Sequence, residues 1–202
     1  MKVDLALVLA AGEGRRMGAP KAALTWGHRP LAIAHAVAAL DAGCAEVRVV
    51  VRAPVVASFP ALPAGARWVF SREDEALGPA GSIVAALCEG LGGASLIAVS
   101  PVDLDPDAWR CLGALSAAFE DARVMAAKPR YEGRSGHPVL VRAGVLAPYL
   151  RREARPLRDV LRALGAGLVS VPVDVAAVPG DLDTPDDLEA LARDGDHRTQ
   201  KR

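Results

Sequence analysis

A cluster of glycines and cations lies near the start of the chain, in the segment Leu9-Ala10-Ala11-Gly12-Glu13-Gly14-Arg15-Arg16-Met17-Gly18-Ala19-Pro20-Lys21. Glycine lets the backbone approach a ligand closely, and successive N–H groups in a turn form a concavity that binds anions. Arginine adds a planar fork that suits phosphate oxygens, and lysine adds a compact charge. The apolar run at residues 3–9 predicts a buried strand directly before this segment. The pattern therefore predicts a loop that binds a polyphosphate at the end of a strand.

Two well-known phosphate-binding patterns do not fit this segment. The dinucleotide-binding pattern requires glycine at its first, third and sixth positions, but Met17 stands at the sixth. The Walker pattern requires Ser or Thr after its lysine, but Ala22 follows Lys21. On the glycines and charges alone, an ordinary turn between a strand and a helix remains an alternative.

Further candidate residues lie in three later segments. Asp103 follows the apolar run at residues 96–99, and a carboxylate at a strand end, facing a triphosphate loop, suits Mg²⁺. Gly78 and Ser82 lie at the start of a predicted helix, where N–H groups can donate to a ligand. His137 lies in a loop that contains glycine and serine.

Each of these segments also has a purely structural interpretation. Asp105 can serve as the N-cap of a helix that begins at Pro106. Pro79 is typical of the first position of a helix, so the segment around it can be an ordinary helix start. His137 can be a solvated side chain in a flexible loop. The segments acquire a common function only if the fold brings them together.

The composition limits the class of protein. The 202 residues suffice for one sizeable core, and 51% hydrophobic with 24% charged residues is typical of a globular chain. Because the formal net charge is zero, no global field attracts nucleic acid or an anionic membrane, and anion binding must be local. The three cysteines form no C-x-x-C pair, which favours a reducing compartment. With no evident signal peptide or membrane span, we expect a cytoplasmic protein without nucleic-acid or membrane partners.

Apolar runs alternate with helical patterns along the chain. This alternation predicts an α/β fold of three layers, in which helices cover both faces of a mainly parallel sheet. Ligands of such sheets bind beyond the carboxyl ends of the strands, where the glycine-rich loop, Asp103 and His137 can converge. We expect a single domain over residues 1–193 and a flexible polar tail over 194–202. The predicted strands are 3–9, 47–51, 68–70, 96–99, 124–127, 138–141 and 168–173, and the predicted helices are 30–42, 79–91, 106–119, 156–164 and 185–192.

The segment from Leu9 to Lys21 resembles the signature L-A-A-G-x-x-x-R-M-G-x-x-K of nucleotidyltransferases with a Rossmann-like, glycosyltransferase-A-like fold, and it meets every fixed position. Within that group the chain is similar to the MobA-like nucleotidyltransferases, most of all to the molybdenum cofactor cytidylyltransferases, whose branch has the form Ala10-Ala11-Gly12. The resemblance extends to Leu188 and implies a mixed sheet with one antiparallel strand.

The resemblance also implies roles for individual residues. It implies that Arg16, Lys21 and Asp103 are catalytic residues and that Asp103 and Asp183 are metal ligands. The residues that it implies for nucleotide binding are Leu9, Ala10, Ala11, Gly12, Gly14, Lys21, Gly78, Ser82 and His137.

This sequence departs from the family pattern at two places. The family's Asp-x-Pro segment has its proline where this chain has Asp105, so Asp105 remains an alternative to Asp103, as Asp181 is to Asp183. The family's R-G-H-P segment is matched here only as G-H-P, because Ser135 separates the arginine from the glycine. We do not expect a general base at this histidine, since an ionised phosphate acceptor needs little deprotonation.

The resemblance implies a Mg²⁺-dependent enzyme that transfers CMP from CTP to the terminal phosphate of molybdopterin, with release of pyrophosphate. CTP and a phosphorylated pterin are thus the expected small-molecule partners, with a molybdoenzyme or its chaperone as recipient of the product. Two alternatives remain open. The enzyme can use GTP or UTP with another phosphorylated acceptor, or the protein can be a nucleotide-binding chaperone or sensor without turnover.

Overall fold

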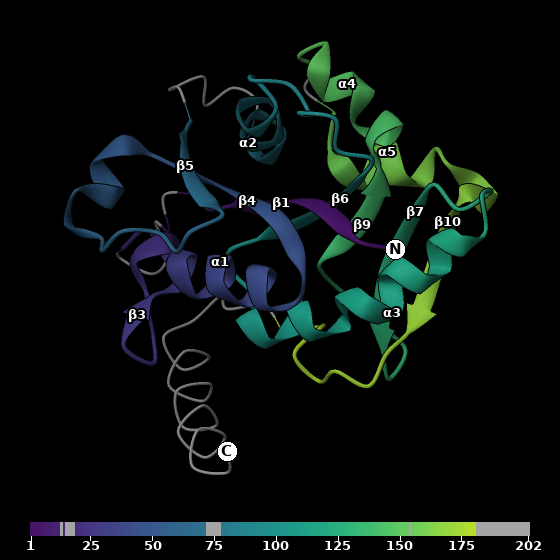
Figure 1. Ribbon diagram of the computed structural model, residues 1–202, viewed down its shortest axis with the longest axis horizontal. Helices are drawn as coiled ribbons and strands as arrows, with labels where there is room; N and C mark the ends of the chain where they lie inside the picture. Colours follow the sequence, from purple (N-terminus) through teal and green to yellow (C-terminus); the bar gives the residue numbers. More distant parts are fainter. Residues whose placement is uncertain (13, 15–18, 72–77, 154, 181–202) are drawn as a thin grey trace.

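The structure is a computed structural model and describes residues 1–12, 14, 19–71, 78–153 and 155–180 (Figure 1). The helix predicted at 185–192 and the tail predicted at 194–202 lie outside the described residues. Within them, α-helices lie above and below one central sheet, as Figure 1 shows. This arrangement confirms the predicted three-layer α/β class.

The central sheet is mixed but mainly parallel. Over the described residues it has eight strands, seven of them in the order β10-β7-β9-β6-β1-β4-β5, with β8 paired to β7. The resemblance implied a mixed sheet with one antiparallel strand. In the structure β9 runs antiparallel between β6 and β7, and the short β8 is also antiparallel to β7. The strands are β1 (Val3–Leu9), β4 (Cys44–Val51), β5 (Ala66–Phe70), β6 (Leu96–Pro101), β7 (Ala126–Tyr131), β8 (Arg134–Ser135), β9 (Val139–Arg142) and β10 (Leu168–Pro172).

β1 lies between two parallel neighbours, and this register determines where the functional segments meet. Leu9 at its end lies opposite Val50 of β4 and Pro101 of β6. The loops that follow β1 and β6 therefore leave the sheet side by side at its carboxyl edge. Parallel strands in such sheets are covered on both faces, which explains why β1 is an almost unbroken apolar run.

Two helical layers bury the two faces of the sheet (Figure 1). One face packs against α1 (Leu31–Asp41) and α3 (Leu112–Ala117), and the other against α2 (Gly78–Ala86), α4 (Ala147–Leu150) and α5 (Leu157–Arg162). Side chains alternate between the layers along each strand: Val8 joins the core on the α1 side, whereas Leu7 joins the core on the α2 side. Both cores continue to the carboxyl edge of the sheet.

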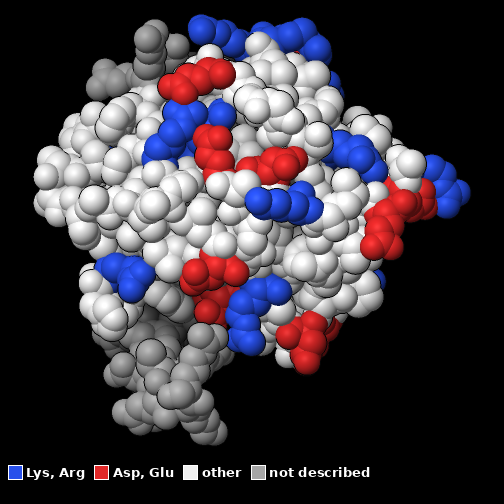
Figure 2. Space-filling view, viewed as in Figure 1, with Lys and Arg blue, Asp and Glu red and all other residues white. Residues whose placement is uncertain are grey.

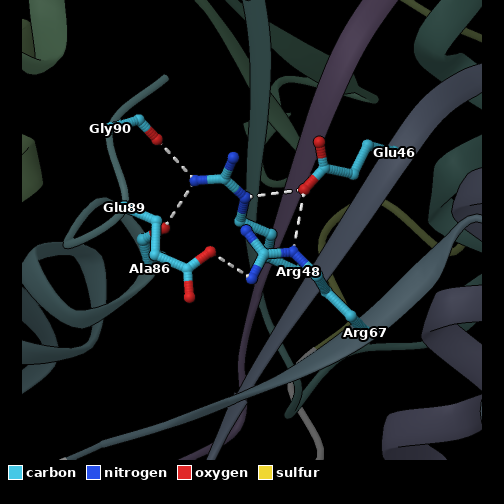
Figure 3. Close-up of polar contacts among 6 residues, drawn as sticks. All are labelled: Glu46, Arg48, Arg67, Ala86, Glu89 and Gly90. Atoms are coloured by element: carbon cyan, nitrogen blue, oxygen red, sulfur yellow. Dashed lines mark hydrogen bonds and ion pairs between the residues drawn. The ribbon is translucent and has the colours of Figure 1, made fainter. Parts of the chain in front are cut away.

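A buried arginine fixes the carboxyl end of α2 (Figure 3). Arg48 of β4 is 3% exposed, and its Nη1 donates to the carbonyl oxygens of Ala86 at 2.9 Å and Gly90 at 2.6 Å. Its Nε donates to Glu46 at 2.8 Å, and Arg67 donates to the same carboxylate oxygen at 3.1 Å. These hydrogen bonds hold the pKa of Glu46 below its ordinary value. A cation beside the last carbonyls of a helix is favourable both as a cap and for the helix dipole.

Several parts of the structure differ from the sequence prediction. The helix predicted at 79–91 ends at Ala86, the strand predicted at 124–127 is β7 at Ala126–Tyr131, and β8 was not predicted. A short hairpin of β2 (Thr25–Trp26) and β3 (Arg29–Pro30) precedes α1, where strands of two residues are too short to show an alternating pattern. The helix predicted at 106–119 is divided into a 3₁₀ turn at Pro106–Cys111, α3, and a second 3₁₀ turn at Ala118–Glu120. α4 was not predicted, since a proline stands at its second position.

The charged side chains on the surface are mixed in sign. Figure 2 shows Lys and Arg interspersed with Asp and Glu in small groups on the face it presents. Among the residues that the structure describes, none of the helices combines the length and apolarity needed to cross a bilayer. Local features rather than a general field must therefore account for any anion binding at the carboxyl edge.

Candidate active site at the carboxyl edge of the sheet

An ion pair joins the two loops that leave β1 and β6. Lys21 Nζ lies 3.1 Å from Asp103 Oδ2, and the two side chains are 17% and 36% exposed. Lys21 begins a 3₁₀ turn, Lys21–Ala23, that follows the glycine-rich segment, and Asp103 stands two residues after the end of β6. The fold thus places the predicted phosphate-binding lysine beside the predicted metal-binding carboxylate, at a position that solvent reaches.

The start of the glycine-rich segment continues the sheet and then turns. Ala10 is buried, and its N–H donates to the Val50 carbonyl at 2.8 Å, so the chain leaves the sheet only after that residue. Gly12 is exposed, and Gly14 has a φ of +61°. A Cβ at Gly14 would overlap with the carbonyl oxygen of Ala19, so this position requires glycine for space as well as for conformation. Arg16 lies outside the described residues.

The loop after β6 holds Asp103 between two buried neighbours. Val102 and Leu104 are 4% and 2% exposed, and the N–H of Val102 donates to the Leu9 carbonyl at 3.1 Å. Asp105 is 3% exposed, and its Oδ1 accepts from the Asp107 N–H at 2.8 Å, which makes it the N-cap of the following 3₁₀ turn. The capping role suggested by the sequence for Asp105 is therefore present, and Asp103 is the carboxylate that faces Lys21.

Gly78 and Ser82 lie in the first two turns of α2. This helix follows β5 and packs against β1, β4 and β5, so its first turn lies at the carboxyl edge of the sheet. Gly78 is exposed with a φ of +51°, whereas Ser82 is 8% exposed. An exposed helix N-terminus can offer N–H donors to a ligand, and Arg48 fixes the opposite end of the same helix.

His137 lies just before β9 and contacts β6. Its Nδ1 is 3.3 Å from the carbonyl oxygen of Val99, two residues before the end of that strand. The preceding residue, Gly136, lies against the backbone of Val178. The histidine thus borders the same edge of the sheet as Asp103, on the side where β9 is inserted.

The acidic residues near the site suit a divalent cation that takes further ligands from phosphate and water. Mg²⁺ usually binds one or two carboxylates and completes its shell in that way. Asp103 provides one solvent-accessible carboxylate, while Asp181 and Asp183 lie outside the described residues. Within the described part of the chain, no three His, Cys, Asp or Glu residues are grouped to form a cage from protein ligands alone. The donor set therefore fits a metal shared with a phosphate-bearing ligand.

One buried histidine near the site was not singled out from the sequence. His35 of α1 is fully buried and hydrogen-bonds to the Leu104 carbonyl and to the indole of Trp109. In the sequence, His35 stands out only as a polar residue among the apolar residues of an Ala-rich helix, and such a histidine is more often a hydrogen-bonded core residue than a functional one.

The strand order, the glycine-rich loop after β1 and the acidic loop after the neighbouring β6 define a Rossmann-like nucleotidyltransferase fold. Residues 6–182 match the family model described as the MobA-like NTP transferase domain, so the chain belongs to that family. A comparison with curated proteins gave no match.

Several solved structures share the fold over almost the whole chain. The homologue of Rv0371c from Mycobacterium sp. strain JC1 is 25% identical, with a TM-score of 0.75, 96% of this chain and 97% of that chain being covered. Rv0371c of Mycobacterium tuberculosis H37Rv, in complex with manganese, is 23% identical, with a TM-score of 0.72 and coverage of 95% and 99%. The 2-C-methyl-D-erythritol 4-phosphate cytidylyltransferase of Thermus thermophilus is 23% identical, with a TM-score of 0.66 and coverage of 97% and 100%. The last two likenesses concern the fold alone.

Proposed function

We propose that this protein is a cytoplasmic, Mg²⁺-dependent cytidylyltransferase that transfers CMP from CTP to the terminal phosphate of molybdopterin. The observation that carries the proposal is the 3.1 Å pair between Lys21 and Asp103, which combines a phosphate-binding cation and a metal-binding carboxylate at one accessible edge. The family supports nucleotidyl transfer in general. The Ala10-Ala11-Gly12 form of the signature supports CTP as donor.

In this proposal the chain's own residues hold the triphosphate. The backbone N–H groups around Gly12 and Gly14, together with Arg16 and Lys21, bind its oxygens, and Gly78 and Ser82 contact the nucleoside. Lys21 exchanges its partner, from the Asp103 carboxylate to a phosphate oxygen, when the nucleotide arrives. A lysine near the α-phosphate stabilises the charge that develops there in the transition state.

Asp103 and Asp183 would hold the metal, which supplies Lewis-acid polarisation of the phosphate oxygens when it is bound. An oxygen of the acceptor's terminal phosphate attacks the α-phosphorus of CTP. The bond from that phosphorus to the bridging oxygen breaks, and pyrophosphate leaves. The protein contributes mainly orientation and fixed charge, as is usual for phosphoryl chemistry. His137, at the edge near β9, orients the acceptor phosphate rather than removing a proton.

The test is pyrophosphate release measured with each of the four nucleoside triphosphates, Mg²⁺ and a panel of phosphorylated acceptors that includes molybdopterin. We expect release that requires molybdopterin and is fastest with CTP. Faster release with GTP or UTP, or with another acceptor, would reassign the substrates within the same family. Saturable nucleotide binding without release under all conditions would replace the enzyme with a binding protein.

A further inference from the structure

The imidazole of His35 is held in one tautomer inside the protein. Its Nε2 lies 3.0 Å from the Leu104 carbonyl oxygen, and because a carbonyl only accepts, Nε2 carries the hydrogen. Its Nδ1 lies 2.9 Å from Nε1 of Trp109, and because an indole only donates, Nδ1 accepts. The two rings stand edge to face, with an interplanar angle of 75°. Both polar atoms of the buried ring are thus used, and each is directed at the segment after β6.

The residue that His35 holds is directly next to Asp103. On one side of Asp103, the N–H of Val102 donates to the Leu9 carbonyl at 3.1 Å. On the other side, the Leu104 carbonyl accepts from His35. Because the flanking side chains of Val102 and Leu104 are buried, the backbone of Asp103 is fixed from both sides, and its side chain extends toward Lys21.

The helix that carries His35 is also attached to the segment that carries Lys21. The N–H of Leu31, the first residue of α1, donates to the Leu24 carbonyl at 2.7 Å, and α1 packs against the 3₁₀ turn Lys21–Ala23. The same helix packs against the 3₁₀ turn that contains Trp109. α1 is therefore the common support of both partners of the ion pair, and His35 is its polar contact with the Asp103 side.

We propose that His35 is a positioning residue for the metal site. Through its hydrogen bond to the Leu104 carbonyl, and with its tautomer fixed by Trp109, His35 holds the Asp103 carboxylate at the place where the metal and the triphosphate meet. This inference rests on the function proposed above. His35 is fully buried and reaches the site only through the backbone of the loop. Burial lowers the pKa of His35 to about 4, so the ring stays neutral and keeps one donor and one acceptor near pH 7. Groups that orient a metal ligand typically change metal affinity by about 10–100-fold when they are removed.

The experiment measures Mn²⁺ binding in the presence of CTP by electron paramagnetic resonance, CTP binding without metal by calorimetry, and kcat and KM for pyrophosphate release. The variants are His35→Leu, which removes both polar atoms, and His35→Gln, which can return an N–H donor near the place of Nε2. The matched control is Tyr149→Phe, which deletes a different hydrogen bond from a buried side chain to a carbonyl, Tyr149 Oη to Arg155 at 2.9 Å. Thermal unfolding of each variant shows that it is folded.

For His35→Leu we expect Mn²⁺ affinity to fall about 10-fold or more and kcat to fall with it, while metal-free CTP affinity stays within about 2-fold. We expect His35→Gln to recover most of the affinity and Tyr149→Phe to match the unaltered protein. If His35→Leu does not fold, Trp109→Phe, which frees the Nδ1 side of the ring, takes its place with an expected loss of about 3-fold or more.

Unchanged Mn²⁺ affinity in the folded His35 or Trp109 variant overturns the inference and leaves the proposed function intact. An equal loss in Tyr149→Phe also overturns it, because the effect then follows general destabilisation. If the unaltered protein binds no Mn²⁺ in the presence of CTP, the proposed function fails, and the inference fails with it.

Discussion

Lys21 and Asp103 are 82 positions apart in the sequence, yet Nζ of the lysine lies 3.1 Å from Oδ2 of the aspartate. The contact exists because β1 and β6 are parallel neighbours that end opposite each other, at Leu9 and Pro101. The loops that follow the two strands therefore lie at the same edge of the sheet, and the side chains that meet there, Lys21 and Asp103, carry opposite charges. In this ion pair each group neutralises the charge of the other. In the proposed reaction Lys21 binds a phosphate oxygen of the triphosphate instead, and Asp103 binds the metal.

Separate replacements of Asp103 and Lys21 should have different effects on CTP binding and on the rate of pyrophosphate release. We expect Asp103→Asn to lower the rate of pyrophosphate release by about 100-fold or more, because in the proposed site the metal would lose a charged ligand. Metal-free CTP binding should be unchanged or tighter in this variant, since a negative charge beside the triphosphate has been removed. Lys21→Met should weaken CTP binding and turnover together. Calorimetry and a pyrophosphate assay measure the two quantities.

The control for this pair is Asp121→Asn, which changes an exposed carboxylate that pairs with Arg123. It should leave both quantities unchanged. Because the Lys21–Asp103 pair is partly exposed, its loss should change the free energy of unfolding by less than about 1 kcal/mol. Full turnover in both Asp103→Asn and Lys21→Met is incompatible with the proposed site.

The buried guanidinium of Arg48 should contribute strongly to stability. Arg48→Met removes the donors to the Ala86 and Gly90 carbonyls and one partner of Glu46 (Figure 3). We expect the free energy of unfolding to fall by about 2–3 kcal/mol, because hydrogen bonds from a charged donor contribute more than neutral ones. Arg67→Met, at a side chain that is 37% exposed, should cost less than about 1 kcal/mol. Urea unfolding of both variants measures this, and equal losses would show that burial of Arg48 adds nothing.

The sequence predicted those elements that depend on local pattern. Residues 3–9 form β1 with the predicted bounds, because an apolar run bordered by a glycine-rich loop has one clear interpretation. The capping role of Asp105 was also visible, since Asp followed by Pro is a local signal. The residue patterns together with the family resemblance indicated Lys21, Asp103 and Gly78 as site candidates. Their roles remain proposals, although the fold places all three at one edge of the sheet.

The rest depends on contacts between distant segments. The resemblance implied one antiparallel strand, but only the structure shows that this strand is β9 and that it lies between β6 and β7, because a short apolar run carries no signal of strand direction. Trp109 lies in the first 3₁₀ turn of residues 106–119, and its hydrogen bond to His35 joins residues 74 positions apart, a contact that no local pattern records. The buried role of Arg48 was equally invisible, since an arginine within an apolar strand can also lie at an edge.

Gly136 should be intolerant of a side chain. Any Cβ at this position would overlap with the carbonyl group of Val178, and the neighbouring residue is His137. We expect Gly136→Ala to lower the free energy of unfolding by about 1–3 kcal/mol, because the backbone must shift to admit it. Gly144→Ala is the control, since nothing lies within 4 Å of its added Cβ. Thermal and urea unfolding compare the two, and equal stability of both variants would refute the close approach.

Burial of neutral His35 should make stability depend on pH in the acid range. Its folded pKa is about 4, below the ordinary value of 6.5, because burial disfavours the charged ring. Between these values the unfolded chain binds the proton and the folded chain does not. The stabilising contribution of neutral His35 is therefore complete above about pH 6.5 and is lost as the pH falls toward about 4. The free energy of unfolding should fall by about 3 kcal/mol at most over this pH range.

Urea unfolding of the unaltered protein and of His35→Gln, at pH values from about 7.5 to about 4.5, measures this contribution, because the variant has no imidazole at this position. We expect the difference in unfolding free energy between the two proteins to shrink steadily below about pH 6.5. A difference that stays constant across the range would mean that His35 titrates alike in the folded and unfolded chains.

A crystal structure with CTP and Mn²⁺, in which anomalous scattering locates the metal, tests whether Lys21 and Asp103 form one nucleotide and metal site. We predict one anomalous peak bonded to the carboxylate of Asp103, with the triphosphate lying along the glycine-rich loop and Lys21 turned from Asp103 to a phosphate oxygen. A metal and nucleotide bound elsewhere on the protein, with the Lys21–Asp103 pair intact, would exclude an active site at this pair.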